Sequence, residues 1–197
     1  MFSRRSRREM TGKPSQTVAC SLSGGGVSSG SPVNDSPFAT TPLDRLEILR
    51  KYRNIAMVGL SANIRRPSHF AAVYLKARGY SIIPVNPAAK EILGRRCYAT
   101  LTEIEEPVDI VDIFRPTSEV PPLVEDAIAI GAKVVWMQLG VIHYEAAQRA
   151  RDAGLEVVMD HCMKIEHGRF FGGLNVLGLS TGVISARAWD PASGTKA

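Results

Sequence analysis

The chain has 197 residues, 45% of them hydrophobic and 22% charged, which is typical of a globular protein with one domain and some tail. No apolar run reaches the roughly 18 residues of a membrane-spanning helix, and the three cysteines are scattered, with none in a CxxC pair, which favours reduced thiols in a cytoplasmic protein. The first 40 residues hold five basic and two acidic side chains, so most of the net charge of +5 lies there. The rest of the chain therefore does not predict a nucleic-acid surface.

Residues 1–40 are predicted to form a disordered basic tail, because they are rich in Ser, Gly and Arg and poor in large apolar side chains. Two alternatives stay open: an organelle transit peptide, which would make the protein mitochondrial, and a nucleic-acid tether built on the arginines of residues 4–8. An extension from an early start codon would also account for the tail, since Met10 is a second candidate start. We expect residues 41–185 to form one folded domain and residues 186–197 to be a flexible C-terminus.

The folded part begins with a helix that Thr41 caps, with Pro42 at its first position and Asp44 three residues after the cap. An alternation of apolar strands and helix-length segments follows. We expect strands over 55–60, 81–85, 108–114, 133–139 and 155–160, helices over 68–78, 119–130 and 143–153, and a helix or turn over 88–93. Strands that are apolar nearly throughout predict a parallel sheet buried on both faces, and right-handed crossovers then give a doubly wound α/β domain of five strands.

Ligands of such sheets bind beyond the carboxyl ends of the strands, at the point where the strand order reverses. The residues to consider are those that follow each strand: 59–68, 84–90, 114–118, 138–142 and 160–164. The first of these segments joins a strand to a helix through a tight loop, which presents backbone N–H groups and a helix N-terminus to an anion. We therefore expect it to hold the diphosphate of a nucleotide cofactor.

The dinucleotide fingerprint GxGxxG is absent, since only Gly59 of its glycines is present, and the position where NAD binding needs an acid holds Asn86 and Pro87. Arg65, Arg66 and Lys90 could instead neutralise an extra ribose phosphate. This pattern favours NADP or coenzyme A (CoA) over NAD.

An ordered set of short motifs then carries a resemblance. Val58-Gly-Leu-Ser61, Arg66-Pro-Ser68, Pro84-Val-Asn-Pro87, Asp109-Ile-Val-Asp112, Trp136-Met-Gln-Leu-Gly140 and Val158-Met-Asp-His-Cys162 occur in that order. From about residue 43 to about residue 170 the chain resembles the small CoA-binding domain family, which is similar in fold to the N-terminal domain of the succinyl-CoA synthetase alpha subunit. The resemblance implies a Rossmann-like domain with CoA in the crevice.

The resemblance also implies site residues. Gly59, Ser61 and Asn63 would lie along the diphosphate, with Arg66 as its ionic partner. Asn86 and Pro87 would border the ribose and adenine, and Phe114 and Arg115 would cover the adenine or its phosphate side. The pantetheine path would be lined by Trp136, Gln138 and Leu139. For Trp136 itself, a position in the core is favoured over a contact with the cofactor, because it lies in a buried strand. On the helix over 68–78, Phe70 and Tyr74 are expected in the core.

Cys162 is the thiol expected near the crevice. A buried, inert thiol is favoured, and a mixed disulfide with CoA is the alternative hypothesis. No catalytic set or metal-ligand spacing is evident, since His161, Cys162 and His167 match no zinc pattern.

The sequence therefore predicts a non-catalytic CoA- or acyl-CoA-binding module that acts as a carrier, sensor or regulatory partner, with CoA as its cofactor. Two alternatives remain: an NADP-dependent oxidoreductase that uses the same crevice, and a CoA-ligase-like subunit that needs a separate partner subunit. A homodimer also stays open.

Overall fold

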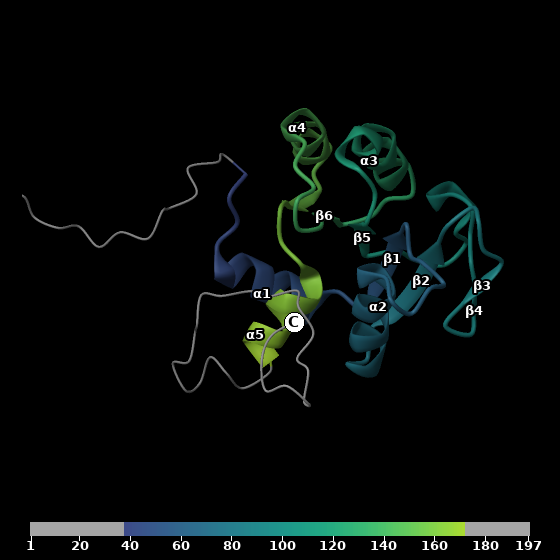
Figure 1. Cartoon of the computed structure of the whole chain (residues 1–197). Helices are drawn as coiled ribbons and strands as arrows, with labels where there is room; N and C mark the ends of the chain where they lie inside the picture. The colour runs from purple at the N-terminus through teal and green to yellow at the C-terminus, as the bar shows by residue number, and fades with distance from the viewer. Residues whose placement is uncertain (1–37, 172–197) are drawn as a thin grey trace, which may run out of the picture. The chain divides into compact units, whose positions relative to one another are not determined.

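A computed structural model describes residues 38–171 of the chain (Figure 1). The predicted tail, apart from its last three residues, and the predicted flexible C-terminus both lie outside the described residues. The longer elements, in chain order, are α1 (Pro42–Lys51), β1 (Asn54–Val58), α2 (Pro67–Ala77), β2 (Ser81–Val85), β5 (Ile110–Ile113), α3 (Val120–Ala129), β6 (Val134–Met137), α4 (Tyr144–Asp152), β7 (Glu156–Val158) and α5 (Met163–Phe171).

Five strands form one parallel sheet in the order β2-β1-β5-β6-β7. Helices α1, α2 and α5 pack on one face of this sheet, and α3 and α4 pack on the other, as Figure 1 shows. The predicted doubly wound α/β fold is therefore confirmed. No helix within residues 38–171 is both long enough and apolar enough to cross a bilayer.

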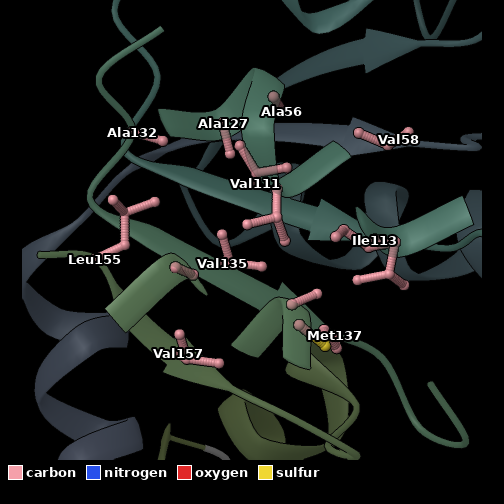
Figure 2. Packing of buried hydrophobic residues seen from close by; sticks show 14 of the residues in the cluster. Ala56, Val58, Val111, Ile113, Ala127, Ala132, Val135, Met137, Leu155 and Val157 are labelled. Carbon is pink, nitrogen blue, oxygen red and sulfur yellow. The ribbon is translucent and has the colours of Figure 1, made fainter. Parts of the chain in front are cut away.

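Alternate side chains of each strand enter two separate cores. In β1, Ala56 and Val58 face α3 and α4, while Ile55 and Met57 face α1, α2 and α5. Figure 2 shows the first of these cores, in which side chains of neighbouring strands, among them Val111 and Val135, lie close to one another, with Ala127 of α3 beside them. Because the central strands are buried on both faces, their carboxyl ends are held in fixed relative positions.

The start of α1 is as predicted. The hydroxyl of Thr41 accepts a hydrogen bond from the backbone N–H of Asp44 (3.2 Å), and the carboxylate of Asp44 accepts one from the N–H of Thr41 (2.8 Å). These reciprocal bonds satisfy two of the N–H groups that a helix leaves without an intrahelical partner.

Residues 88–93 contain no helix, so the helical alternative for this segment was wrong. A turn leads into a small antiparallel hairpin of β3 (Glu91–Ile92) and β4 (Arg95–Arg96). Leu93 and Gly94 join its strands, and both have positive φ (55° and 74°), a conformation that suits a two-residue hairpin loop and excludes a helix. The buried Ile92 anchors the hairpin to the domain.

The last helix, α5, was not predicted, because its inward-facing side chains are largely polar and leave no apolar stripe. Glu166 and His167 are both buried. The carboxylate of Glu166 pairs with Arg45 of α1 at 2.9 Å, and His167 Nδ1 lies 3.1 Å from the hydroxyl of Tyr74 on α2. Specific polar contacts thus dock α5 on the other two helices of its layer.

Phe70 was expected in the core and is instead 59% exposed, so that expectation was wrong, whereas Tyr74 is partly buried. The face of α2 that contacts the sheet is formed by the smaller side chains Ala71, Ala72 and Leu75. Phe70 lies outside this face.

Candidate functional site

The carboxyl ends of the five parallel strands meet at one edge of the sheet, here called the carboxyl edge. The strand order reverses between β1 and β5, because the chain leaves β1 toward β2 on one side and later returns to pair β5 on the other. The first loop at this edge, residues 59–66, joins β1 to α2. This is the position at which doubly wound sheets hold ligands.

Gly59 fixes the path of this loop. Its φ is +82°, and its N–H donates to the carbonyl of Val85 at 2.9 Å. A Cβ placed here would lie 2.8 Å from both the carbonyl oxygen of Phe114 and Cδ of Arg115. Glycine is required both for the left-handed backbone and for the close approach of the 114–115 segment.

Ser61 and Asn63 shape the loop from within. The hydroxyl of Ser61 accepts from the N–H of Asn63 at 3.1 Å, and the side-chain oxygen of Asn63 accepts from the N–H of Arg65 at 2.9 Å. Ser68 in the first turn of α2 accepts from the N–H of Ser61 at 3.2 Å. The loop is therefore held in shape by its own side chains.

The N-terminus of α2 differs from the starts of α1 and α4. At α4 the ring of His143 accepts a hydrogen bond from the N–H of Ala146 (3.2 Å), so this histidine is a helix cap. At α2 the cap position is Arg66, whose side chain makes no capping bond. Within residues 38–171, the N–H groups of Ser68 and His69 also have no hydrogen-bond acceptor. An uncapped helix start of this kind attracts anions.

Three exposed cationic side chains lie in the segments that follow β1 and β2, two of them directly before α2 and one after β2. For Arg65, Arg66 and Lys90, no hydrogen bond or ion pair joins the side chain to any other described residue. Arg115 differs, because its guanidinium pairs with the carboxylate of Glu119 at 2.6 Å. The first three therefore keep their full charge available to a ligand.

A cavity of about 180 Å³ opens at the carboxyl ends of β1 and β2, on the α3 side. Among the predicted site residues it is lined by Gly59, Pro87 and Arg115. The rest of its lining was missed by sequence reasoning: Val58, Val85, Ala99, Thr100, Leu101, Glu119, Leu123 and Asp126. Glu119, Leu123 and Asp126 are spaced four and three residues apart, which places them on one face of a helix. This spacing is a sequence signal that could have identified them.

Asn86 joins two loops at this edge. Its side-chain N–H donates to the carbonyl of Leu60 at 2.8 Å, and its side-chain oxygen accepts from the N–H of Ala88 at 2.9 Å. Both polar atoms of its amide are thus engaged with the backbone, and they hold the turn after β2 against the loop after β1.

The predicted site residues in β6 and directly after it are mostly buried. Trp136 is fully buried, and its indole N–H donates to the carbonyl of His161 at 2.6 Å, which agrees with the core interpretation of this residue. Gln138 is buried too, whereas Leu139 is 58% exposed. Phe114, at the end of β5, is partly buried and packs against the core on the α2 side. Of the three predicted pantetheine contacts, only Leu139 is exposed to solvent at the edge.

Gln138 donates its side-chain N–H to Oδ1 of Asp112 at 2.7 Å. Asp112 is fully buried, and its other carboxylate oxygen, Oδ2, has no hydrogen-bond partner. Burial raises the pKa of this carboxyl to about 7, although the hydrogen bond from Gln138 opposes the shift. Sequence reasoning quoted Asp112 within a motif but did not anticipate this buried carboxyl.

Cys162 lies just before α5 and is partly buried. Burial raises the pKa of its thiol, and hydrogen bonds from the backbone N–H groups of Ile165 and Lys164 offset this only in part. The thiol is therefore protonated at neutral pH, which disfavours nucleophilic chemistry. Within residues 38–171, no hydrogen bond joins a hydroxyl or thiol at this edge to a histidine ring or a carboxylate.

Comparison with known proteins gives a consistent result. A model of the CoA binding domain family matches residues 53–168. YneT of Bacillus subtilis, described as uncharacterised, is 40% identical over 121 residues, which make up 61% of this chain and 90% of YneT. The solved structure of a hypothetical protein from Pyrococcus horikoshii is 40% identical with a TM-score of 0.65, and the match covers 68% of this chain and 94% of that protein.

A more distant relative is much larger. The ADP-forming acetate–CoA ligase II of Archaeoglobus fulgidus is 31% identical over 83 residues, which are 41% of this chain but only 12% of the ligase. The similarity is therefore confined to a small part of that enzyme.

Proposed function

The chain belongs to the family of CoA binding domains, and on that premise we propose that it binds CoA or an acyl-CoA at the carboxyl edge without catalysing a reaction on it. One observation carries the proposal. The start of α2 is uncapped, and three exposed cations without partners among the described residues, Arg65, Arg66 and Lys90, lie in the segments after β1 and β2, which follow the carboxyl ends of these strands.

The phosphates of CoA account for these charges. The diphosphate lies along the loop of residues 59–66 and faces the free N–H groups at the start of α2. Arg66 pairs with it, because a guanidinium offers several donors to phosphate oxygens in a fixed geometry. Arg65 and Lys90 remain to neutralise the phosphate on the ribose.

The cavity beside Pro87 and Arg115 takes the adenine. Its volume of about 180 Å³ is below the roughly 300–1,000 Å³ of pockets that enclose a whole ligand. It therefore suits one flat group, with the remainder of the cofactor lying along the open edge. Asn86 and Phe114 act in this proposal through the loops that they hold, since Asn86 is already bonded to the backbone and Phe114 packs on the core.

The pantetheine arm runs from the loop toward the ends of β6 and β7, with exposed Leu139 as its apolar contact. Two buried side chains hold the ends of these strands in place. Gln138 is bonded to Asp112 of β5, and Trp136 is bonded to the carbonyl of His161, which follows β7. Cys162 borders the far end of this path. Its raised pKa argues against a mixed disulfide with CoA under reducing conditions.

A non-catalytic role as carrier, sensor or regulatory module follows from the side chains at this edge. The described residues offer charge and shape to a phosphorylated ligand, but no nucleophile paired with a base. Within residues 38–171, no group of three or more His, Cys, Asp or Glu side chains could hold a metal ion.

Calorimetric titration of the full chain with CoA, NADP and NAD tests the proposal. We expect saturable binding of CoA and no heat of binding from NAD or NADP. Tight binding of NADP with no response to CoA would contradict the proposal and support the oxidoreductase alternative.

A second candidate function is that of a CoA-ligase subunit that needs a partner protein. The local similarity to the ADP-forming acetate–CoA ligase favours it, since that enzyme contains a segment resembling this chain within a much longer protein. Recovery of a nucleotide-binding partner subunit on affinity purification of the full chain would support this alternative, and recovery of the chain alone would argue against it.

A further inference from the structure

The cavity at the carboxyl ends of β1 and β2 combines an apolar lining with a few charged side chains. The apolar lining comes from the two strand ends, the segments that follow β2 and helix α3: Val58, Val85, Pro87, Leu101 and Leu123. The charged side chains are those of Arg115, Glu119 and Asp126, of which the last two lie at the cap position and in the middle of α3. Such a lining suits a flat, uncharged ring with polar groups at its rim.

Two of these three charges cancel within the protein. The guanidinium of Arg115 pairs with the carboxylate of Glu119 at 2.6 Å. Asp126 is partly buried, and no hydrogen bond or ion pair joins its carboxylate to any other residue within 38–171. The cavity therefore carries one uncompensated negative charge.

This charge is unexpected beside a site for a ligand with several phosphate groups, because like charges repel each other. The neighbouring acid, Glu125, is exposed and pairs with Arg149 of α4 at 2.8 Å. An ionised carboxylate accepts hydrogen bonds and has no proton to donate. Asp126 therefore suits a part of the ligand that is uncharged and offers an N–H or O–H donor.

The adenine base carries such a donor. Its exocyclic amine lies at the position where guanine carries a carbonyl oxygen, which is an acceptor. We propose that Asp126 selects adenine in this cavity by accepting a hydrogen bond from the exocyclic amine of the base. A carbonyl oxygen in the same place would face the carboxylate with no proton between them, and both acceptors would stay unpaired. The inference rests on the proposed binding of CoA and adds to it a residue that determines which base is accepted.

The packing of α3 holds Asp126 in a fixed position beside the cavity. Val120, Val124 and Ala127 of this helix are fully buried in the core on its side of the sheet. Leu123, three residues before Asp126, lies on the same face of the helix and lines the cavity with it. Leu123 thus contacts the ring of the bound base, while Asp126 meets its edge. Because the helix is already in place, little conformational entropy is lost on binding.

Binding of two ligands to the full chain tests this assignment. One is CoA, and the other is a CoA analogue whose base is unsubstituted purine, with hydrogen in place of the exocyclic amine. In calorimetric titrations the parent chain should bind CoA about 10- to 150-fold more tightly than the analogue, the range expected for a hydrogen bond to a charged group. In the Asp126→Ala chain the two affinities should agree within about twofold.

The ratio of the two affinities isolates the contact between Asp126 and the amine. Loss of a negative charge near the phosphates raises the affinity for both ligands alike, so this effect cancels in the ratio. Glu125→Ala is the matched control, because it removes the same charge from the next position of α3, outside the cavity, and should leave the ratio unchanged. Alanine is a strong helix former, so both variants are expected to fold.

Two results would overturn the assignment and leave the proposed function intact. Equally tight binding of CoA and the analogue by the parent chain would mean that the amine is not recognised. A ratio that persists in the Asp126→Ala chain would locate recognition of the amine at another residue. Failure of the parent chain to bind either ligand would contradict the proposed function itself, and with it the assignment of Asp126.

Discussion

Two sets of charged side chains, one at each edge of the sheet, differ in their partners. At the amino edge, where the strands begin, the carboxylate of Asp109 accepts hydrogen bonds from the N–H groups of Arg53 (3.0 Å) and Asn54 (2.9 Å), and Glu156 accepts one from the hydroxyl of Tyr52 (2.9 Å). At the carboxyl edge, the exposed side chains of Arg65, Arg66 and Lys90 have no such partners among the described residues, although Arg115 there pairs with Glu119.

Because of this difference, we expect one set of charged residues to contribute to the stability of the fold and the other to the binding of a ligand. Charges that hold the fold are already compensated within the chain, and removing one of them leaves its partners unsatisfied. Cations without a partner contribute little to folding and are available to an anionic ligand. Substitutions at the two edges should therefore affect different properties of the protein.

The largest effect is expected for Gly59→Ala at the carboxyl edge. The new Cβ would meet the backbone at Phe114 and would force alanine into a left-handed conformation, costing about 2–5 kcal/mol in the free energy of unfolding. Gly79→Ala at the amino edge is the matched control, since its φ is also positive but no atom lies within 4 Å of the added Cβ. It should cost only about 1–2 kcal/mol.

Urea denaturation of both variants measures these free energies. Equal losses for Gly59→Ala and Gly79→Ala would mean that the approach of the 114–115 segment does not constrain the loop.

Arg66→Ala should weaken CoA binding by roughly 1.5–3 kcal/mol, or about 10- to 150-fold, because it removes a charged hydrogen bond to phosphate. Affinity for pantetheine, which lacks the phosphates, should not change. Arg50→Ala, an exposed arginine on α1, serves as the control and should leave CoA affinity intact. Equal loss of CoA and pantetheine affinity in Arg66→Ala would indicate that Arg66 acts through the fold.

Asp109→Ala should show the reverse pattern. It removes the acceptor for two backbone N–H groups, so the free energy of unfolding should fall by roughly 1.5–3 kcal/mol while CoA affinity stays within about twofold. Glu105→Ala, at an exposed acid, should change stability by less than about 0.5 kcal/mol. A drop in CoA affinity without loss of stability in Asp109→Ala would remove the distinction between the edges.

The smallest effect concerns a carboxyl beneath the carboxyl edge. The pKa of Asp112 is raised to about 7 in the folded chain, above the ~3.9 of an unfolded aspartate, so the folded state binds more protons between these values. Stability from this group is fully present below pH 4 and is lost as pH rises through 7. Between pH 6 and pH 8 the loss is about 1.4 kcal/mol.

Asp112→Asn should abolish this slope. The measurement is the difference in unfolding free energy between the variant and the parent chain at pH 6 and pH 8, which cancels other groups such as His167, whose pKa is lowered mainly by burial. A difference that does not change with pH would show that Asp112 stays ionised across this range.

Much of the fold could be predicted from the sequence, because the determining signals are local. Thr41, Pro42 and Asp44 mark a helix start by their spacing alone, and the apolar strands identify a parallel sheet. The loop of residues 59–66 was located in the same way, as the tight connection after the first strand.

The remaining features depend on contacts between residues distant in the sequence. Helix α5 is docked by Glu166 and His167, whose partners Arg45 and Tyr74 are far away in the chain. The cavity depends on α3, and the buried carboxyl of Asp112 depends on the helices that cover it. No local pattern carries this information.

The central claim is that CoA lies across the carboxyl edge, with its diphosphate at the start of α2. A crystal structure of the full chain grown with excess CoA tests it most directly. We expect density for the diphosphate beside Gly59 and Arg66 and for the adenine beside Pro87. A carboxyl edge that holds no CoA, or CoA bound elsewhere on the molecule, would contradict the claim.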